Sequence, residues 1–482
     1  MSAGQQLRVR ATPIDGLLEV DLPLHRDARG WFKENWQREK MLAAGLPDFR
    51  PVQNNVSFNA ERGTTRGLHA EPWDKYIAVL NGEIFGAWVD LRPGADFGSV
   101  HTARLDPGKA VFVPRGVANA FQTLAPDTVY SYLVTEHWSA EARDKYSYVN
   151  LADAQLDIDW PIPLDQAVVS EADRNHPELA NAKPVAPKRI AVLGGTGQLG
   201  RAFAELAAGD DRMEVLTRRE VDLSHPDPLR GLNLSDYSHV INAAAVTAVD
   251  RAETPQCRKE AWQVNADAVR HLARRCAANS VSLVHVSTDY VFDGTDPDVA
   301  EDHPLAPLGV YGQSKAAGEM AVLAHQGHLV VRTSWVIGEG GNFVATMRRL
   351  AEQGVNPAVI DDQVGRPTFA SELARGIMHL IDSRAAAGAY HLQCEGEPVS
   401  WYQLARRVFE LCGHDPQRVL PTTTHEYAAG RQDFAPRPAH STFDLSKLRA
   451  AGFVPRDHEQ LLAEYLEAGS TADTHAERIL KS

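Results

Sequence analysis

A glycine-rich turn at residues 188–203 constrains the fold of this chain more than any other feature. The segment reads KRIAVLGGTGQLGRAF, an apolar strand followed by a turn and an amphipathic helix, and Gly194, Gly197 and Gly200 give the spacing G-x-x-G-x-x-G. Such a turn lets the backbone approach a pyrophosphate and lets the helix pack closely on its strand. The pattern predicts the start of a nucleotide-binding domain, although 187 residues precede it.

Hydrophobic periodicity changes at this turn. Upstream, short runs rich in β-branched and aromatic residues, such as KYIAVL and TVYSYLVTEHW, predict an all-β half, and Asn81-Gly82 predicts a hairpin turn between two of the strands. Downstream, runs such as HVINAAA and HLVVRTSW alternate with helical segments, which predicts a parallel α/β sheet. We expect a first domain over residues 1–180, a proline-containing linker over 181–187 and a second domain over 188–482.

Charge and composition exclude some classes of partner. Lys plus Arg total 49 against 63 for Asp plus Glu, a net charge of −14, which argues against nucleic acid and anionic membranes as partners. No apolar stretch is long enough to span a membrane, the start MSAGQQLRVR lacks the apolar core of an export signal, and the four cysteines form no CxxC pair. We therefore expect a cytoplasmic protein with reduced thiols, in which local positive charge holds any anionic ligand.

A tyrosine and a lysine four residues apart give the second domain a candidate chemistry. Tyr311 and Lys315, in VYGQSKAAGE, face the same side of a helix, so the lysine ammonium can favour the phenolate and lower the pKa of the tyrosine. Thr288, in STDYVF at the end of an expected strand, adds a hydroxyl able to bond a substrate oxygen. Together the three side chains predict an acid–base site.

The second domain resembles the dTDP-4-dehydrorhamnose reductases, members of the extended short-chain dehydrogenase/reductase family. The resemblance extends over residues 188–482 and rests on the glycine turn followed by NAAAVTAVDRAE, STDYVFDG, YGQSK, RTSWVIG and DDQVGRPT. It implies a Rossmann fold with a smaller substrate-binding lobe and hydride transfer from a nicotinamide to the C4 ketone of a deoxysugar nucleotide. In that reaction Tyr311 would be the proton donor, Lys315 its partner and a ribose ligand, and Thr288 a ligand of the carbonyl. The residues implied to line the sugar pocket are Asp289, Tyr290 and Trp335.

The same resemblance implies a dinucleotide site at the glycine turn and the strands that follow. Arg218 and Arg219 come after the second expected strand, where an acidic residue would favour NADH, so we expect a preference for NADPH, with NADH still possible. Asp222 is expected near the adenine. The residues implied to contact the dinucleotide are Gly194, Thr196, Gly197, Gln198, Leu199, Gly200, Arg218, Asp222, Leu223, Ala243, Ala244, Ala245, Tyr311 and Lys315.

The first domain resembles the dTDP-4-dehydrorhamnose 3,5-epimerases over nearly its whole length. The resemblance rests on DARGWFKENW, VQNN, RGLH, NGEIFGAWVDLR and SEADRNHPEL, in that order. It implies proton abstraction beside a ketone, with His69 as the base and Tyr132 as the acid on the opposite face, Tyr130 being the competing candidate. It also implies that Asp153 orients His69 and that Lys75 faces the developing oxyanion. The residues implied to hold the substrate nucleotide are Arg29, Glu34, Gln53, Asn55 and Arg66.

Two features separate this domain from the common pattern of the family it resembles. The segment between His69 and Lys75 is shorter, and Asn119 stands where many members carry a second histidine. The β-rich pattern suggests a cupin-like jelly roll, a fold that often binds metal through an H-x-H cluster. Since no H-x-H occurs in residues 1–187, we expect no metal.

Together the two resemblances predict a bifunctional enzyme of dTDP-L-rhamnose biosynthesis, in which the reductase consumes the product of the epimerase. Its partner would be a small dTDP-sugar, and the expected assembly is a homodimer. Two alternatives stay open. The first domain could be an inactive binding or dimerising module, or the reductase could set the opposite C4 configuration and give dTDP-6-deoxy-L-talose.

Overall fold

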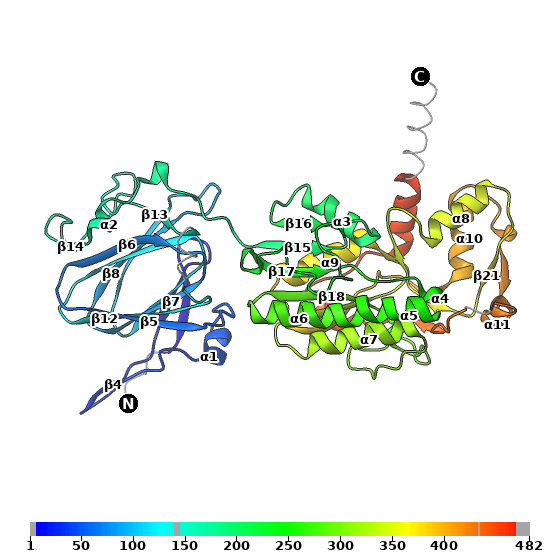
Figure 1. Ribbon diagram of the computed structural model, residues 1–482, viewed down its shortest axis with the longest axis horizontal. Helices are drawn as coiled ribbons and strands as arrows, with labels where there is room; N and C mark the ends of the chain where they lie inside the picture. Colours follow the sequence, from blue (N-terminus) through cyan, green and yellow to red (C-terminus); the bar gives the residue numbers. More distant parts are fainter. Residues whose placement is uncertain (1–5, 139–144, 432–433, 469–482) are drawn as a thin grey trace, which may run out of the picture. The chain divides into compact units, whose positions relative to one another are not determined.

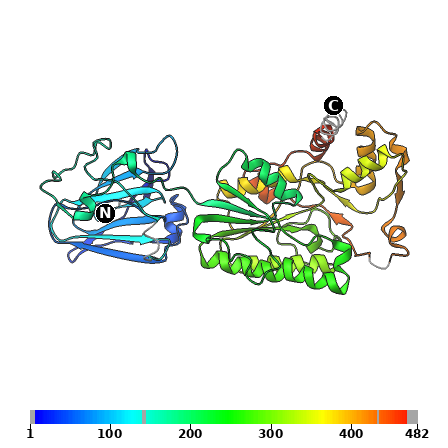
Figure 2. The ribbon, with the colours of Figure 1, turned by 45° about the horizontal axis from the view of Figure 1, so that its top comes forward.

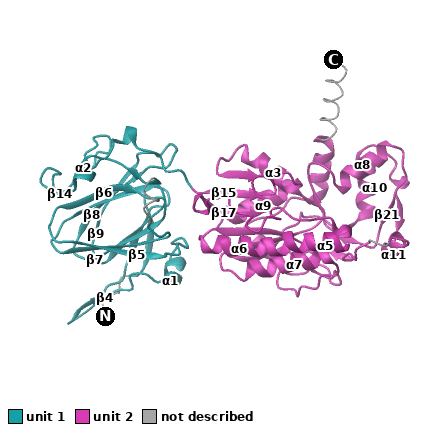
Figure 3. Cartoon of the chain, viewed as in Figure 1, with its two compact units in different colours: residues 1–187 teal, residues 188–482 magenta. Residues whose placement is uncertain are grey.

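The computed structural model describes residues 6–138, 145–431 and 434–468, and the chain forms two compact units, Met1–Pro187 and Lys188–Ser482 (Figure 3). The first unit is built almost entirely from strands, and the second alternates strands with helices (Figure 1). The fold class expected for each half is thereby confirmed. Among the described residues, no helix is both long enough and apolar enough to cross a bilayer.

The first unit is a sandwich of two sheets (Figure 2). Ile77 and Val111 from one sheet and Trp88 and Phe121 from the other lie in one apolar cluster, so the sheets pack face to face. One sheet has the order β1 (Arg8–Ala11), β2 (Leu18–Asp21), β10 (Lys109–Val113), β7 (Lys75–Asn81), β12 (Thr128–Val134), β5 (Gln53–Asn59). The other has the order β13 (Ser147–Tyr148), β6 (Thr64–Ala70), β11 (Val117–Thr123), β8 (Ile84–Asp90), β9 (Val100–Leu105), with β14 (Val168–Val169) parallel to β6. The smaller elements are the hairpin β3 (His25–Asp27) and β4 (Gly30–Phe32) and the helices α1 (Arg38–Ala43) and α2 (Glu171–Arg174).

The Asn81-Gly82 turn joins two strands that belong to different sheets. The hairpin expected there is wrong, because β7 pairs with β10 and β12 whereas β8 pairs with β9 and β11. Gly82 does adopt a positive φ of 83°, and a Cβ at this position would meet the side chain of Thr128. The glycine therefore turns the chain at a corner between sheets, which the local sequence does not distinguish from a hairpin.

The segment expected as a linker lies against the first unit. The Val185 amide donates to the Leu91 carbonyl at 2.8 Å, and the side chains of Ala182 and Val185 are buried in the same apolar cluster as Leu91. Arg115 Nε donates to the Ala186 carbonyl at 3.1 Å. These contacts make the chain part of the first unit as far as Pro187.

The second unit is a six-stranded parallel sheet with helices on both faces (Figure 2). Ile190 and Val192 pack on one face with residues of α3 (Gln198–Ala207) and α9 (Ala370–Asp382), and Ala191 and Leu193 pack on the other with residues of α6 (Ala268–Ala278). The sheet has the order β16 (Met213–Leu216), β15 (Arg189–Leu193), β17 (Tyr237–Asn242), β18 (Ser282–Thr288), β19 (Leu329–Thr333), β24 (Gly388–His391). The helices around it are α3 (Gln198–Ala207), α4 (Val249–Ala252), α5 (Pro255–Trp262), α6 (Ala268–Ala278), α7 (Val310–Leu323) and α9 (Ala370–Asp382). Because the chain leaves β15 toward opposite neighbours, the carboxyl ends of β15 and β17 border a crevice of the kind that binds nucleotides.

A smaller lobe completes the second unit and has an apolar core of its own. Val344, Leu404, Val408 and Phe409 are fully or almost fully buried in it. The lobe contains α8 (Phe343–Glu352), α10 (Trp401–Leu411), α11 (Thr424–Ala428), β21 (Ala358–Ile360) and β26 (Leu420–Thr422). The short pieces that accompany it are β20 (Val336–Ile337), β22 (Val364–Gly365), β23 (Thr368–Phe369), β25 (Val399–Ser400), β27 (His440–Ser441) and α12 (Ser446–Ala450).

Because the two units have separate cores, a substitution that leaves a cavity in one core should destabilise only that unit. Phe203 on α3 is fully buried in the core of the second unit, so Phe203→Ala is expected to lower the unfolding free energy of that unit by about 3–5 kcal/mol. Hydrogen–deuterium exchange of the full chain in increasing urea should show earlier loss of protection in peptides from residues 188–482 and none in peptides from 1–187. The control is Glu205→Ala on the exposed side of the same helix. Equal loss of protection in both units would contradict separate cores.

Candidate active sites

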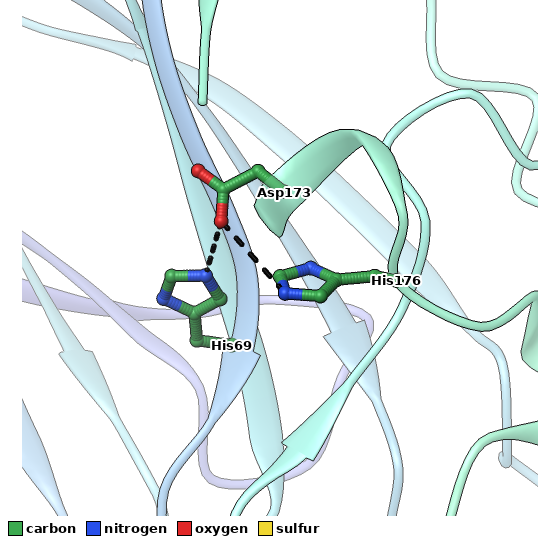
Figure 4. Close-up of side chains that lie close together, drawn as sticks. All are labelled: His69, Asp173 and His176. Carbon is green, nitrogen blue, oxygen red and sulfur yellow. Dashed lines mark hydrogen bonds and ion pairs between the residues drawn. The ribbon is translucent and has the colours of Figure 1, made fainter. Parts of the chain in front are cut away.

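The first unit contains a histidine–aspartate pair (Figure 4). His69 lies on β6 and its Nε2 is 2.9 Å from Asp173 Oδ1, a hydrogen-bond distance. Asp173 lies on the short helix α2, where its amide donates to the capping hydroxyl of Ser170 at 3.1 Å. Burial acts to raise the pKa of Asp173, but hydrogen bonds from His69 and Ser170 outweigh it, and the net shift is downward. An ionised Asp173 accepts a hydrogen bond from the Nε2–H of His69, which leaves Nδ1 of His69 as the basic nitrogen.

Asp153 does not orient His69, contrary to the sequence expectation. Its Oδ2 accepts from the Leu179 amide at 2.5 Å and its Oδ1 from the Gln155 amide at 2.8 Å. Both oxygens therefore hold the backbone of their loop. Asp173, not Asp153, has the position beside His69 that the sequence expectation required. The stretch SEADRNHPEL already carried a signal for this, because a serine three residues before an acidic residue is typical of a helix start that presents the acid at a fixed angle.

A second histidine, not expected from the sequence, borders the same pair. His176 Nε2 is 3.9 Å from Asp173 Oδ1, and its ring stacks on Tyr148 with 4.7 Å between ring centres. The ligand atoms of His69, Asp173 and His176 all lie within 4.8 Å of one another, so the trio has side-chain types that can bind transition metals. The 2.9 Å distance between His69 Nε2 and Asp173 Oδ1 is also that of an ordinary hydrogen bond. The expectation of a metal-free domain stays a prediction.

Lys75 lies buried in the interior between the two sheets of the first unit. Its Nζ donates to Asn119 Oδ1 at 2.6 Å, contacts the carboxylate of Glu71, and lies 5.9 Å from the centre of the Tyr132 ring. Asn119 is paired in register with His69 across β6 and β11. Asn119 therefore holds the Lys75 side chain beside the strand that carries His69.

The two candidate tyrosines on β12 differ in access. Tyr130 is buried and stacked on Phe121, with 4.2 Å between ring centres, and its hydroxyl accepts from Asn119 Nδ2 at 3.4 Å. Tyr132 is partly exposed, and burial raises its pKa while the nearby Arg66 guanidinium opposes the rise. Of the two, Tyr132 has the open position that a proton donor to substrate needs.

The residues expected to hold the substrate nucleotide fall into two groups. Arg66 lines a cavity of about 660 Å³ together with His69, Asp173 and His176, and the side chains of Gln53 and Asn55 on β5 are bonded to each other at 2.8 Å. Gln53 and Asn55 lie outside the lining of that cavity, as do Arg29, whose side chain is 90 % exposed and paired with Asp27, and Glu34, which is paired with Lys40. The structure does not bring Arg29 and Glu34 to His69 of the same chain.

The second unit contains a cavity of about 560 Å³ at the carboxyl ends of β15 and β17. Gly194 has a φ of 91°, a Cβ at Gly200 would overlap the Gly194 carbonyl, and a Cβ at Gly195 would lie 2.8 Å from Val215. The turn is thus a close-packed cradle of the kind that receives a pyrophosphate. The expected dinucleotide and sugar residues that line this cavity are Gly194, Thr196, Gly197, Gln198, Leu199, Arg218, Asp222, Leu223, Ala243, Ala244, Ala245, Thr288, Asp289, Tyr290, Tyr311, Lys315 and Trp335. Gly200 packs behind the turn.

Tyr311, Lys315 and Thr288 meet at the floor of this cavity. The Thr288 hydroxyl acts to lower the pKa of Tyr311 and donates to Asp289 Oδ1 at 2.9 Å, and Lys315 Nζ donates to the Val286 carbonyl at 2.6 Å. Burial raises the pKa of Tyr311, so the expectation that Lys315 lowers it is wrong for the protein without ligand. Burial likewise raises the pKa of Asp289 to about 6 and lowers that of Lys315 to about 8. The tyrosine is therefore held as a phenol, the form that a proton donor requires.

The sugar side of the cavity contains a residue that sequence reasoning missed. Trp335 has a φ of 46° and stacks on Trp401, the first residue of α10, with 3.5 Å between ring centres. A Cβ at Gly365 would lie 2.8 Å from the Trp335 ring. The stacked indoles form an apolar wall that joins the nucleotide-binding sheet to the smaller lobe, and only the packing of α10 brings Trp401 there.

These two sites define a two-domain enzyme, a proton-transfer site in a β-sandwich followed by a dinucleotide-dependent oxidoreductase site. A family model described as dTDP-4-dehydrorhamnose 3,5-epimerase matches residues 11–181, and one described as RmlD substrate binding domain matches residues 188–470. An RmlC homolog from Streptococcus pyogenes is 54 % identical over 182 residues, covering 37 % of this chain and 91 % of that protein. A dTDP-4-dehydrorhamnose reductase from Mycobacterium tuberculosis is 40 % identical over 305 residues, covering 61 % and 97 %.

A solved structure agrees with the second of these matches. The dTDP-4-dehydrorhamnose reductase from Bacillus anthracis, determined in complex with NADP, superposes with a TM-score of 0.51 at 32 % identity, covering 58 % of this chain and 98 % of that one. The chain belongs to the dTDP-4-dehydrorhamnose 3,5-epimerase family through its first unit and to the RmlD reductase family through its second. It is a fusion of the two enzymes.

The corrected aspartate assignment can be tested with a matched pair of variants. Asp173→Asn removes the charge that holds His69 in the tautomer with basic Nδ1, so deuterium uptake from heavy water into a 4-keto-6-deoxy sugar nucleotide should fall by about 10²- to 10⁴-fold. Asp153→Asn should leave that rate within a factor of about two to three and affect stability instead, since a lost loop hydrogen bond is worth only about 1 kcal/mol. Mass spectrometry of recovered substrate measures the uptake. A large loss in Asp153→Asn with none in Asp173→Asn would reverse the assignment.

Proposed function

We propose that this chain catalyses two consecutive steps of dTDP-L-rhamnose formation. The first is 3,5-epimerisation of dTDP-4-dehydro-6-deoxy-D-glucose, and the second is NADPH-dependent reduction of the C4 ketone of dTDP-4-dehydro-L-rhamnose. The observation that carries the proposal is the presence, in one chain, of the His69–Asp173 pair beside a cavity and of the Tyr311–Lys315 pair at the floor of a glycine-cradled cavity.

The first site performs carbon-acid chemistry. Nδ1 of His69 removes the proton from the carbon next to the ketone, and the Asp173 carboxylate stabilises the imidazolium that forms. Burial lowers the pKa of Lys75 to about 7, and the Glu71 carboxylate beside it favours the charged form. The Lys75 ammonium stabilises the enolate oxygen as negative charge develops there. Tyr132 returns a proton on the opposite face, which inverts the centre. The same residues then carry out the same proton removal and return at the second carbon.

The second site performs reduction at C4. The cradle of Gly194, Thr196 and Gly197 with Ala243–Ala245 fits the pyrophosphate and nucleosides of the cofactor, which supplies the hydride when bound. Thr288 holds the substrate carbonyl oxygen, and Tyr311 gives that oxygen a proton as negative charge develops on it. Lys315 binds ribose hydroxyls, and the stacked indole of Trp335 excludes water from the sugar face.

The enzyme uses NADPH. Arg218 lines the cavity, where its Nε is 3.3 Å from Asp222 and its side chain is largely exposed, so the guanidinium is free to turn toward a 2′-phosphate. Arg219 is exposed and lies outside the cavity lining. Of the two arginines, Arg218 is the one proposed to contact the phosphate.

Two further expectations from the sequence stay predictions. A homodimer is supported by the first unit, in which Val56 and Phe58 on β5, an edge strand of its sheet, are 60 % and 61 % exposed. Exposed apolar side chains along an unpaired strand edge are typical of contact surfaces. A cytoplasmic location is consistent with both enzyme families.

The two activities should separate on mutation. Tyr311→Phe should still take up deuterium at C3 and C5 of the substrate but fail to oxidise NADPH, because only the second site has lost its proton donor. His69→Asn should lose the uptake and stall reduction, and NADPH oxidation should return when a separate active epimerase is added. Each loss is expected to be about 10²- to 10⁴-fold.

Mass spectrometry for deuterium and absorbance for NADPH measure the two activities in parallel. Undiminished uptake in His69→Asn would remove His69 from the mechanism. Absence of uptake in the unmutated protein would favour an inactive binding module.

Cofactor preference gives a further matched pair. Arg218→Gln should raise the KM for NADPH roughly tenfold through loss of a charge-assisted contact, with little change in the KM for NADH. Arg219→Gln should change neither value. Steady-state kinetics with both cofactors decide the matter, and equal effects of the two substitutions would contradict a specific role for Arg218.

A further inference from the structure

A buried carboxylate contacts the ammonium of Lys75, and it comes from the short segment that joins β6 to β7. The side chain of Glu71 pairs with Lys75 Nζ, and the two side chains are only 12 % and 5 % exposed. In an extended chain, residues four apart lie about 13 Å from each other, so this contact requires the segment to bend back on itself. The pair therefore depends on the segment between His69 and Lys75, which is shorter than in the common pattern of the family.

This bend is held by groups from outside the segment. Arg115 Nη1 donates to the Pro72 carbonyl at 2.9 Å, and the Arg115 amide donates to Asp74 Oδ1 at 2.8 Å. The Asp74 amide in turn donates to the Thr135 hydroxyl oxygen at 3.2 Å. These contacts fix the backbone that directly follows Glu71, so its carboxylate is held in the interior beside the lysine.

The second feature that separates this domain from the family pattern, Asn119, bonds the same ammonium. Asn119 Oδ1 accepts from Lys75 Nζ at 2.6 Å, and Asn119 Nδ2 donates to the Tyr130 hydroxyl at 3.4 Å. An amide oxygen accepts a hydrogen bond but carries no negative charge, so Glu71 is the partner that compensates the charge of the lysine. An ammonium has three N–H groups, and its partners among the described residues, Glu71 and Asn119, leave one of them for an enolate oxygen.

The strands beside Lys75 contribute apolar or neutral side chains. In register with it lie Val113 on β10 and Val134 on β12. The centre of the Tyr132 ring is 5.9 Å from Nζ, and burial raises the pKa of this tyrosine, so it faces the lysine as a neutral phenol. None of these three side chains compensates a positive charge.

Burial works against the charge of Lys75. It lowers the pKa of the ammonium to about 7, and β6 contributes Arg66 and His69, which can only add positive charge. A carboxylate in contact favours the ammonium, so loss of the charge on Glu71 would lower the pKa of Lys75 further. The stabilisation of a developing oxyanion depends on the ammonium, because an uncharged amine supplies little of it.

We propose that Glu71 is a positioning residue of the first site, which keeps Lys75 in its ammonium form and, with Asn119, directs it toward the enolate oxygen. The inference rests on the proposed role of Lys75 in stabilising that oxygen. It gives the two unusual features of this domain one purpose. The short segment brings a carboxylate to the lysine, and the amide of Asn119, unlike a histidine, has no basic nitrogen that competes for the proton of the ammonium.

Glu71→Gln removes the charge and keeps the shape of the side chain. Because Lys75 then loses its proton at lower pH, the alkaline limb of the pH profile of kcat/KM for deuterium uptake should move down by about one unit. At pH values above the limb, the uptake should be roughly tenfold slower than in the unmutated full chain. The control is Glu83→Gln, because Glu83 is 43 % exposed and pairs with Arg104 at 3.6 Å, and it should leave the profile unmoved.

A double variant separates the charge of Lys75 from a general effect on the site. Arginine keeps its charge at every working pH, so Glu71→Gln should no longer move the limb in a Lys75→Arg background. A role of Glu71 in folding alone would instead lower the uptake equally at every pH and leave the limb of the single variant where it was, which would overturn the proposal.

The ionisation of Lys75 is a second readout, and it does not depend on activity. In the full chain labelled with carbon-13 at lysine Cε, the NMR signal that is missing from Lys75→Arg reports this side chain. Its titration should move about one unit lower in Glu71→Gln, and an unmoved titration would overturn the proposal.

Two further variants complete the test. If Glu71→Gln does not fold, Glu71→Asp withdraws the carboxylate by one methylene and should shift the titration of Lys75 in the same direction by a smaller amount; no shift would overturn the proposal. Undiminished deuterium uptake in Lys75→Met would instead contradict the proposed function, since it would remove the lysine from the mechanism.

Discussion

Removal of water from the groups that carry protons is the constraint on which both sites depend. Lys75, Tyr311 and Lys315 are almost completely buried, so their charged and uncharged forms differ in cost by several kcal/mol, as expected for groups taken out of water. Each of these groups is therefore surrounded by fixed partners, such as Asn119 for Lys75. His69 differs because a third of its side chain is open to the cavity, as a base that must reach substrate requires.

Each site catalyses one of two consecutive steps, and neither site alone gives the final product. Epimerisation through an enolate leads to an equilibrium mixture, and reduction of one member of the mixture draws it forward at the expense of the cofactor. Fusion supplies the two activities in equal amounts. The chemistry also explains why the acid–base groups differ, since carbon protons need a histidine whose imidazolium is stabilised by Asp173, whereas a developing alkoxide needs a phenol that has kept its proton.

Local sequence was sufficient to predict structure at positions where only one residue type fits. The glycine turn predicted the dinucleotide cradle because Gly200 packs against the Gly194 carbonyl, where no other residue fits. Motif order was sufficient for Tyr311 and Lys315, which one helix holds together. Prediction failed where a partner comes from a distant segment. Asp173 reaches His69 only because α2 packs against β6, and Trp401 reaches Trp335 only through packing of the lobe.

The predictions of a lowered pKa for Tyr311 and of a hairpin at Asn81-Gly82 were wrong for related reasons. The sequence gives the spacing of Tyr311 and Lys315 but not their burial, which outweighs the expected influence of the lysine. It gives a turn at Gly82 but not the sheet that each flanking strand joins. The outlying positions of Arg29 and Glu34 likewise depend on where the β3–β4 hairpin lies, which motif order does not specify.

Proton NMR of the final product tests the central claim most directly. The full chain, given only dTDP-4-dehydro-6-deoxy-D-glucose and NADPH in ordinary water, should release a sugar nucleotide whose ring coupling constants are those of dTDP-L-rhamnose, with inversion at both C3 and C5. One NADPH should be consumed per molecule formed. A reduced product that keeps the D configuration at C3 and C5, or no reduction until a separate epimerase is added, would contradict the account.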